Sequence, residues 1–112
     1  MIIPTEAQEQ EMFCRWLDLN KIDYFAIPNG GSRHKLEAIN MKKQGIKKGV
    51  SDMFIFAPEK ALFVEMKRRD HKLSRTSKEQ IEFQDKANHY PYAKARICYG
   101  YDEAVAFVKE FV

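Results

Sequence analysis

The chain has 112 residues, of which 45% are hydrophobic and 12% aromatic. This length is typical of one domain, so we expect residues 1–112 to form a single domain with one hydrophobic core. No run approaches the ~20 consecutive apolar residues of a membrane-spanning helix, which excludes membrane proteins of that kind. The first eleven residues carry three glutamates and no cationic apolar run. A signal peptide is therefore not expected, and we predict a cytoplasmic protein of a bacterial or phage-infected cell.

The net charge of +3 is distributed unevenly along the chain. Residues 33–78 contain thirteen Lys or Arg and five Asp or Glu, a net charge of +8 (13 − 5). Residues 1–32 have a net charge of −3 (2 − 5), and residues 79–112 have −2 (4 − 6). A basic centre between acidic ends favours a polyanionic partner. A solvated charged face explains the charge alone equally well.

The first half of the chain carries the periodicities of two helices and one strand. Apolar residues at helical spacing predict a helix over residues 6–20. A short apolar run over 24–27 predicts a strand, which the turn residues Pro28-Asn29-Gly30-Gly31 bring to an end. Residues 34–44 are expected to form a short second helix.

The second half begins with a predicted β-hairpin. Two apolar runs, 53–56 and 61–66, flank the turn residues Pro58-Glu59-Lys60. After a basic, irregular stretch, the capping-box pattern Ser77-Lys78-Glu79-Gln80 opens a helix that reaches about Tyr90. A strand over 95–99 and a helix from Asp102 through Phe111 complete the order, which is typical of an α/β fold with a mixed central sheet. The aromatic residues of the strands are expected in the core rather than as base-stacking groups: Tyr24, Phe25, Phe54, Phe56 and Phe63.

Three residues of the hairpin point to chemistry. Side chains alternate along a strand, so Glu65 and Lys67 share one face, and the hairpin brings Asp52 beside Glu65. Two adjacent carboxylates repel each other, which favours a hard cation between them, and the carbonyl oxygen of Met66 is placed to bind Mg²⁺ as well. Lys67 can then orient or deprotonate a water for attack on phosphorus. An isolated Glu-x-Lys pair is more often a surface ion pair, so this prediction depends on Asp52.

The chain resembles the VRR-NUC domain of the PD-(D/E)XK nuclease superfamily. The resemblance rests on Gly49-Val50-Ser51-Asp52, on Leu62-Phe63-Val64-Glu65-Met66-Lys67 and on Ser77-Lys78-Glu79-Gln80. It covers nearly the whole chain, and Ser51 stands where the superfamily has a proline. The resemblance implies a restriction-endonuclease-like α-β-β-β-α-β core and phosphodiester cleavage that depends on Mg²⁺ or Mn²⁺. It also implies a homodimer that acts on branched DNA, such as Holliday junctions, in replication or repair.

Nucleases of this family also use a glutamate from the first helix. The family pattern Glu-x-x-x-Gln, eleven residues before a Leu, selects Glu6 through Gln10 and Leu17. Helical spacing points instead to Glu9, which lies nearer the centre of the apolar stripe. Acids in a first helical turn also stabilise the helix dipole without any catalytic role. We select Glu6 and keep Glu9 as the alternative.

Further site residues follow from the same resemblance. Gln80 matches the family's motif glutamine, which would reach the active site, whereas a capping-box bond to Ser77 is the alternative role. Basic and polar side chains on both sides of the scissile phosphate are expected to contact the DNA backbone, although some serve only solubility. These are Asn29, Arg33, Lys42, Lys43, Lys47, Lys48, Arg68, Arg69, Lys72 and Arg75.

Three functions stay open at this point. The leading hypothesis is a metal-dependent, structure-selective endonuclease for branched DNA. The second is a nuclease of broader specificity that acts on flaps or plain duplex. The third is a noncatalytic DNA-binding module, against which the intact Asp52, Glu65 and Lys67 argue, because a binder has no use for a metal-gathering acid pair. No organic cofactor is expected.

Overall fold

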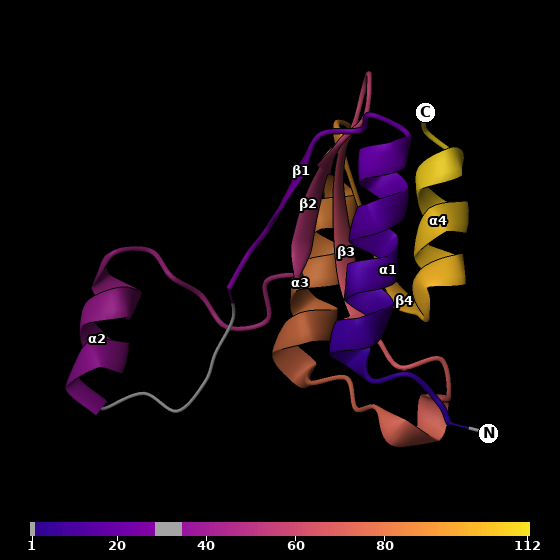
Figure 1. The fold of residues 1–112 in the computed structure, drawn as a ribbon. Coiled ribbons are helices and arrows are strands. Elements are labelled where there is room, and N and C mark those ends of the chain that lie inside the picture. Colours follow the sequence, from indigo (N-terminus) through magenta and orange to yellow (C-terminus); the bar gives the residue numbers. More distant parts are fainter. Residues whose placement is uncertain (1, 29–34) are drawn as a thin grey trace.

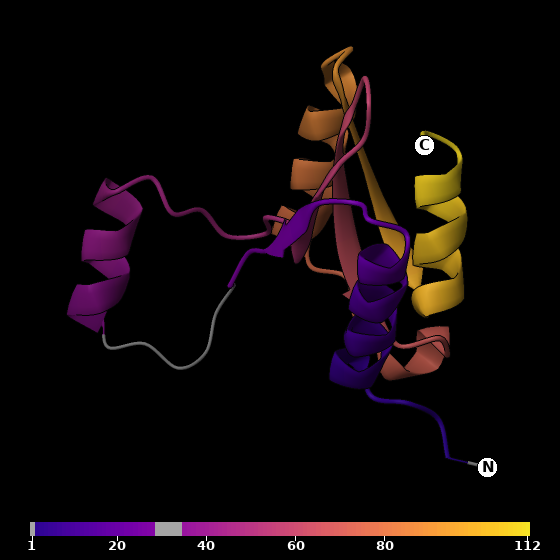
Figure 2. The same ribbon diagram turned by 45° about the horizontal axis from the view of Figure 1, so that its top comes forward.

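A computed structural model gives the fold of the chain and describes residues 2–28 and 35–112 (Figures 1 and 2). Helices and strands follow one another in the predicted order. The elements are α1 (Glu6–Leu19), β1 (Tyr24–Ala26), α2 (Lys35–Lys43), β2 (Met53–Phe56), β3 (Ala61–Lys67), a 3₁₀ turn (His71–Leu73), α3 (Lys78–His89), β4 (Ala93–Tyr99) and α4 (Tyr101–Lys109).

The four strands form one mixed sheet in the order β1-β2-β3-β4. β1 pairs with β2 and β2 with β3 in antiparallel orientation, and β3 pairs with β4 in parallel. The predicted hairpin is confirmed, because Phe56 pairs with Ala61 across the turn. A parallel pair needs a crossover, and α3 supplies it between β3 and β4. The mixed sheet with flanking helices agrees with the fold class expected from the sequence.

The hydrophobic core lies on the face of the sheet that α1 and α4 cover (Figure 1). Phe13 and Leu17 of α1 and Phe107 of α4 are almost completely buried there. Every second residue of the hairpin points into the same layer, which is the alternation expected of a strand. These strand residues are Met53, Ile55, Leu62, Val64 and Met66, all 0% exposed.

The opposite face carries the strand phenylalanines, and here the expectation of a buried core is wrong. Phe25 is 49% exposed and Phe56 is 54% exposed. Phe54 and Phe63 are partly buried, whereas Tyr24 packs against the core on the other face. The reason is the placement of α3, which lies over β4 at the far side of the sheet from β1. Alternation alone does not reveal which face of an edge strand is covered.

The starts of β4 and α4 also differ from the sequence prediction. β4 begins at Ala93 rather than residue 95, because its parallel pairing with β3 starts at Ala61 and Ala93. α4 begins at Tyr101, with Gly100 as its N-cap at φ +89, so Asp102 lies in the first turn rather than at the cap.

α2 stands out from the sheet on the side of β1 and β2 (Figures 1 and 2). Among the described residues, no helix has the length and apolar character to cross a bilayer.

Candidate active site

The hairpin of β2 and β3 brings Asp52 and Glu65 together. Met53 lies opposite Val64, and one further step in this register sets Asp52 opposite Glu65 on the same face of the sheet. The backbone N–H of Met66 donates to Oδ2 of Asp52 at 2.7 Å, which holds this carboxylate against the end of β3. The N–H and C=O of one residue in an antiparallel ladder face the same neighbouring strand, so the Met66 carbonyl also faces Asp52.

Lys67 is held beside Glu65 by several acceptors. Both side chains are nearly inaccessible, with Glu65 2% and Lys67 5% exposed. Nζ of Lys67 lies 3.7 Å from Oε2 of Glu65 and donates to the carbonyl of Arg75 at 2.7 Å and to Oε1 of Gln80 at 3.1 Å. A buried lysine requires such partners, because an uncompensated buried charge is costly. The ammonium group is therefore fixed next to the carboxylate pair.

Gln80 makes the capping contact of its motif and also contacts Glu65 and Lys67. Its Nε2 donates to Oε2 of Glu65 at 3.1 Å, and its Oε1 accepts from Lys67. The same Oε1 also accepts from the backbone N–H of Ser77 at 3.0 Å, which completes the capping box of α3. The start of α3 is thus tied to the carboxylate pair through one amide side chain.

The charge of Asp52 raises the pKa of both Glu65 and Glu6. The pKa of Glu65 is raised from its ordinary 4.5 to about 8, first by burial, then by the charge of Asp52 and by the hydrogen bond that the two carboxyls share only when one is protonated, while Lys67 opposes the shift. The pKa of Glu6 is also raised, by partial desolvation and the charge of Asp52, and is again opposed by Lys67. Glu6 of α1 therefore faces the same charges as Glu65.

Glu9, the alternative acid on α1, has a different role. It is completely buried, and its carboxylate accepts two hydrogen bonds from the Arg69 guanidinium at 2.7 and 2.9 Å. It also accepts from the backbone N–H of Tyr101 at 3.0 Å, which ties α1 to the start of α4. The hydrogen bonds from Arg69 hold the pKa of Glu9 below its ordinary value. Of the two α1 acids, Glu6 is the one that lies near the charge of Asp52, and its role as the first-helix acid stays a prediction.

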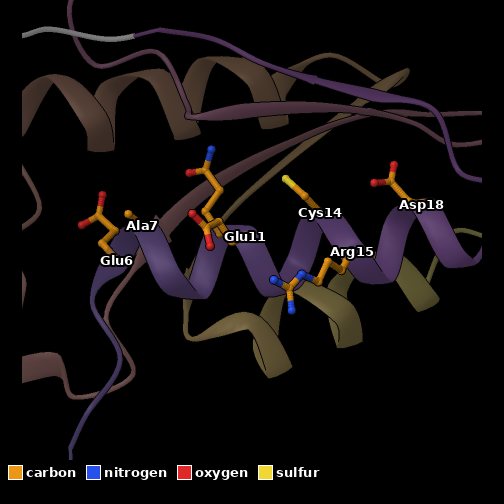
Figure 3. Close-up of a pocket in the computed structure, with 7 residues that line it drawn as sticks. Glu6, Ala7, Glu11, Cys14, Arg15 and Asp18 are labelled. Carbon is orange, nitrogen blue, oxygen red and sulfur yellow. The ribbon is translucent and has the colours of Figure 1, made fainter.

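An open groove of about 600 Å³ runs along α1 and begins at Glu6 (Figure 3). Glu11 and Asp18 line it together with Arg15, so acids outnumber bases there. A groove of this sign repels a polyanion.

The predicted DNA-contacting residues divide into two groups. Arg68 donates to the backbone carbonyls of Ile3 and Pro4, both at 3.0 Å, and Arg69 is engaged with Glu9. The structure therefore gives these two arginines intramolecular partners that hold the N-terminal segment and α1. The second group is exposed and consists of Lys42, Lys43, Lys47, Lys48, Lys72 and Arg75. Asn29 and Arg33 lie outside the described residues.

Sequence reasoning missed the contacts that hold Asp52 in place. Gly49 has φ +84, and a Cβ there would collide with the backbone of Glu79 at the start of α3. Ser51 is buried, and its hydroxyl accepts from Nε2 of Gln84 at 2.9 Å. The serine at the superfamily's proline position is therefore tied to α3. Gly49, three residues before Asp52, could have indicated this contact, because a glycine often marks a close approach of two backbones.

The donor set fits a divalent cation. No group of three or more His, Cys, Asp and Glu side chains is gathered for a metal within residues 2–28 and 35–112. The acid pair Asp52 and Glu65, with a backbone carbonyl, is instead the sparse oxygen set that Mg²⁺ takes together with water. Oε1 of Glu65 is buried and has no hydrogen-bond partner among the described atoms. A bound cation or a proton shared with Asp52 would satisfy this oxygen.

Comparison with known proteins supports the fold. No protein-family model matches the sequence, and no curated protein matches it. A solved structure described as a VRR_NUC domain protein is similar over 100% of this chain and 91% of its own, with a TM-score of 0.80 and 19% sequence identity. The fold expected from the sequence motifs, that of a VRR-NUC domain, is thus confirmed.

Proposed function

We propose that this protein is a Mg²⁺- or Mn²⁺-dependent DNA endonuclease with Asp52, Glu65 and Lys67 at its active site. The observation that carries the proposal is the buried Glu65 carboxylate, which sits beside Asp52 and Lys67 with one oxygen unpartnered among the described atoms. A structural ion pair would pair both oxygens, since an unsatisfied buried acceptor costs about 1–3 kcal/mol. An oxygen left open beside a second carboxylate is the arrangement of a cation site.

The roles follow from the contacts. Asp52, Glu65 and the Met66 carbonyl would hold the ion, with Glu6 approaching from α1. When bound, the ion supplies positive charge against the phosphate and lowers the pKa of water. Lys67 would present an N–H group to the developing negative charge, and its Nζ is the atom that we propose takes up or donates a proton. Gln80 is a positioning residue, because it holds both Glu65 and Lys67.

The proposed substrate is branched DNA, such as a four-way junction formed in replication or repair, cut by a homodimer. The exposed lysines of α2 and the following segment would contact phosphates on either side of the cut. A junction has near-twofold symmetry, and a C₂ dimer puts identical sites on opposite strands. The motif resemblance supports this substrate. The neighbour's description, a VRR_NUC domain protein, agrees with a nuclease domain and names no substrate.

The test is cleavage of labelled duplex, flap, splayed-arm and four-way-junction DNA with Mg²⁺ or Mn²⁺. Asp52→Ala, Glu65→Ala and Lys67→Ala should each reduce cleavage at least a hundredfold, and EDTA should abolish it. Glu59→Ala, an exposed acid in the hairpin turn, is the control and should cut normally. Cleavage by a folded Glu65→Ala variant at more than a few per cent of the normal rate would refute the site.

Assembly has a separate test. We expect light scattering at micromolar concentration to give about twice the 13.2 kDa chain mass, alone or with junction DNA. A protein that is monomeric under both conditions and still cuts flaps would show that flap DNA, rather than a junction, is the substrate. Uniform cutting of every substrate would instead support a nuclease of broad specificity, and binding without cutting would support a noncatalytic module.

A further inference from the structure

Five phenylalanines form a continuous ladder of rings on the face of the sheet that carries the candidate active site. Phe25 stacks on Phe54 with ring centroids 5.1 Å apart, and Phe56 lies edge-on to Phe54 at 4.7 Å. Phe54 continues to Phe63 at 5.2 Å, and Phe63 to Phe83 of α3 at 5.2 Å. The ladder therefore runs from the β1 edge of the sheet to α3.

The two ends of this ladder differ in exposure. At one end, Phe83 of α3 closes over Phe63, and both rings are partly buried. At the other end, Phe25 and Phe56 are 49% and 54% exposed, with ring centroids 6.2 Å apart. In the part of the chain that the structure describes, α3 is the helix on this face, and it lies over β4. Phe25 and Phe56 thus form one contiguous exposed apolar patch rather than two isolated rings, and contiguous apolar patches are the feature that marks binding surfaces.

The exposed rings lie on the same strand face as the carboxylate pair. Along β2, Asp52, Phe54 and Phe56 occupy alternate positions, so all three point to one side of the sheet. Asp52 and Phe56 are four residues apart, which is about 13 Å along a strand. A polymer that rests on Phe56 and Phe25 would thus pass the candidate active site within a few of its units.

Positive charge accompanies the same edge of the sheet. The chain leaves β1 after Ala26 and returns to β2 at Met53, and these two residues pair with each other. Between them it carries α2, which stands out from this edge (Figures 1 and 2). Lys42, Lys43, Lys47 and Lys48 on this excursion are exposed. Aromatic rings for bases and lysines for phosphates are the combination that binds single-stranded nucleic acid.

We propose that Phe25 and Phe56 form a stacking platform for unpaired bases of the DNA substrate, and this proposal rests on the proposed nuclease function. In a duplex the bases are stacked on one another inside the helix, so they cannot lie on these rings. The platform therefore selects substrates with an unpaired segment next to the cut, such as a splayed arm, a flap or an opened junction. It supplies affinity with little sequence preference, because every base has a π-face.

The experiment measures binding without cleavage. Fluorescence anisotropy in EDTA compares a labelled oligo(dT) with an abasic oligonucleotide of the same length, which keeps the phosphates but lacks the bases. The wild-type protein should bind oligo(dT) about tenfold or more tighter than the abasic strand. Phe56→Ala and Phe25→Ala should each remove most of this preference and leave binding of the abasic strand unchanged.

Two further variants separate stacking from other effects. Phe56→Leu keeps apolar bulk without a ring and should behave like Phe56→Ala, whereas Phe56→Trp should retain the preference. Tyr92→Ala removes a 61% exposed aromatic outside the ladder and should have no effect. Circular dichroism confirms that each variant is folded, and the half-exposed position of Phe56 makes folding of its variants expected.

Several outcomes would overturn the platform. Equal binding of oligo(dT) and the abasic strand by the wild-type protein would do so, as would an equal loss for both strands in Phe56→Ala. A dimer that becomes a monomer on Phe56→Ala would show that a second copy covers the rings. Because the binding assay contains EDTA and no metal, its results are independent of cleavage. Base-dependent binding by a protein that never cuts would leave the platform standing and refute the nuclease.

Discussion

Replacing Glu65 by glutamine tests the electrostatics of the candidate site without requiring any substrate. Glutamine has the size of a protonated glutamate and can still accept the hydrogen bond from Gln80. At low pH, where Glu65 is protonated, the variant and the wild type should therefore have nearly the same free energy of unfolding. At higher pH the wild type must hold a buried charge beside Asp52, and the variant does not.

The sign and size of the difference follow from the raised pKa. Between pH 4.5 and about 8, Glu65 binds more protons in the folded than in the unfolded chain, so its contribution to stability is lost as pH rises through this window. The change from 4.5 to about 8 corresponds to about 5 kcal/mol, at 1.36 kcal/mol per pKa unit. The neighbouring Glu6 is exposed, so water reaches the site and screens its charges. We therefore expect Glu65→Gln to be more stable than the wild type at pH 8 by about half of this free energy.

The assay is urea unfolding in EDTA at pH 5, 6, 7 and 8, followed by circular dichroism. Glu59→Gln, an exposed acid in the β2–β3 turn, is the matched control and should run parallel to the wild type. Wild-type and Glu65→Gln stabilities that stay parallel from pH 5 to 8 would refute the description of Glu65 as a buried carboxyl coupled to Asp52. A variant that is less stable than the wild type at pH 8 would refute it as well.

Three further predictions concern the backbone, the DNA surface and the metal. Gly49→Ala should cost about 3 kcal/mol and lower the melting temperature by roughly 10 °C or more, because of its positive φ and the collision with Glu79. Lys47→Ala combined with Lys48→Ala should weaken binding of all DNA sequences alike and reduce the slope of log affinity against log salt by about 2. Mg²⁺ at millimolar concentration should raise the melting temperature of the wild type at pH 8 but not that of Asp52→Asn.

Each of these has its own control. Gly45→Ala also introduces a side chain at positive φ, +93, but meets no atom within 4 Å, so it should cost clearly less than Gly49→Ala. Equal costs would mean that the close approach to α3 is absent. Lys86→Ala with Lys109→Ala removes two exposed lysines elsewhere and should leave the salt slope unchanged. The Mg²⁺ prediction has a second measurement: a calorimetric titration should show Mg²⁺ affinity rising from pH 6 to 8, because Glu65, whose pKa is raised to about 8, must lose its proton to bind.

The strand pattern was sufficient to predict that Asp52, Glu65 and Lys67 lie side by side. Alternation places Glu65 and Lys67 on one face, and the hairpin register sets Asp52 opposite Glu65. These relations depend on residues close in sequence and on a fixed period of two, so a local rule predicts them. The same applies to the Ser77–Gln80 capping box, which the structure contains.

Partners far apart in sequence were decided only by tertiary structure. Arg68 and Arg69 follow Lys67 directly and look like DNA contacts, yet they bind the carbonyls of Ile3 and Pro4 and the carboxylate of Glu9. A buried acid in the apolar stripe of α1 requires a cation, but the sequence does not say which of nineteen Lys and Arg supplies it.

The fate of the strand phenylalanines shows the same limit. The alternation of β2 assigns Phe54 and Phe56 to one face, as local backbone geometry requires. Whether that face is buried depends on where the crossover helix lies, and α3 covers β4 and leaves the β1 edge open. Periodicity fixes the direction of a side chain relative to its own strand. Burial depends on the tertiary packing of elements that are far apart in sequence. No local pattern encodes that packing.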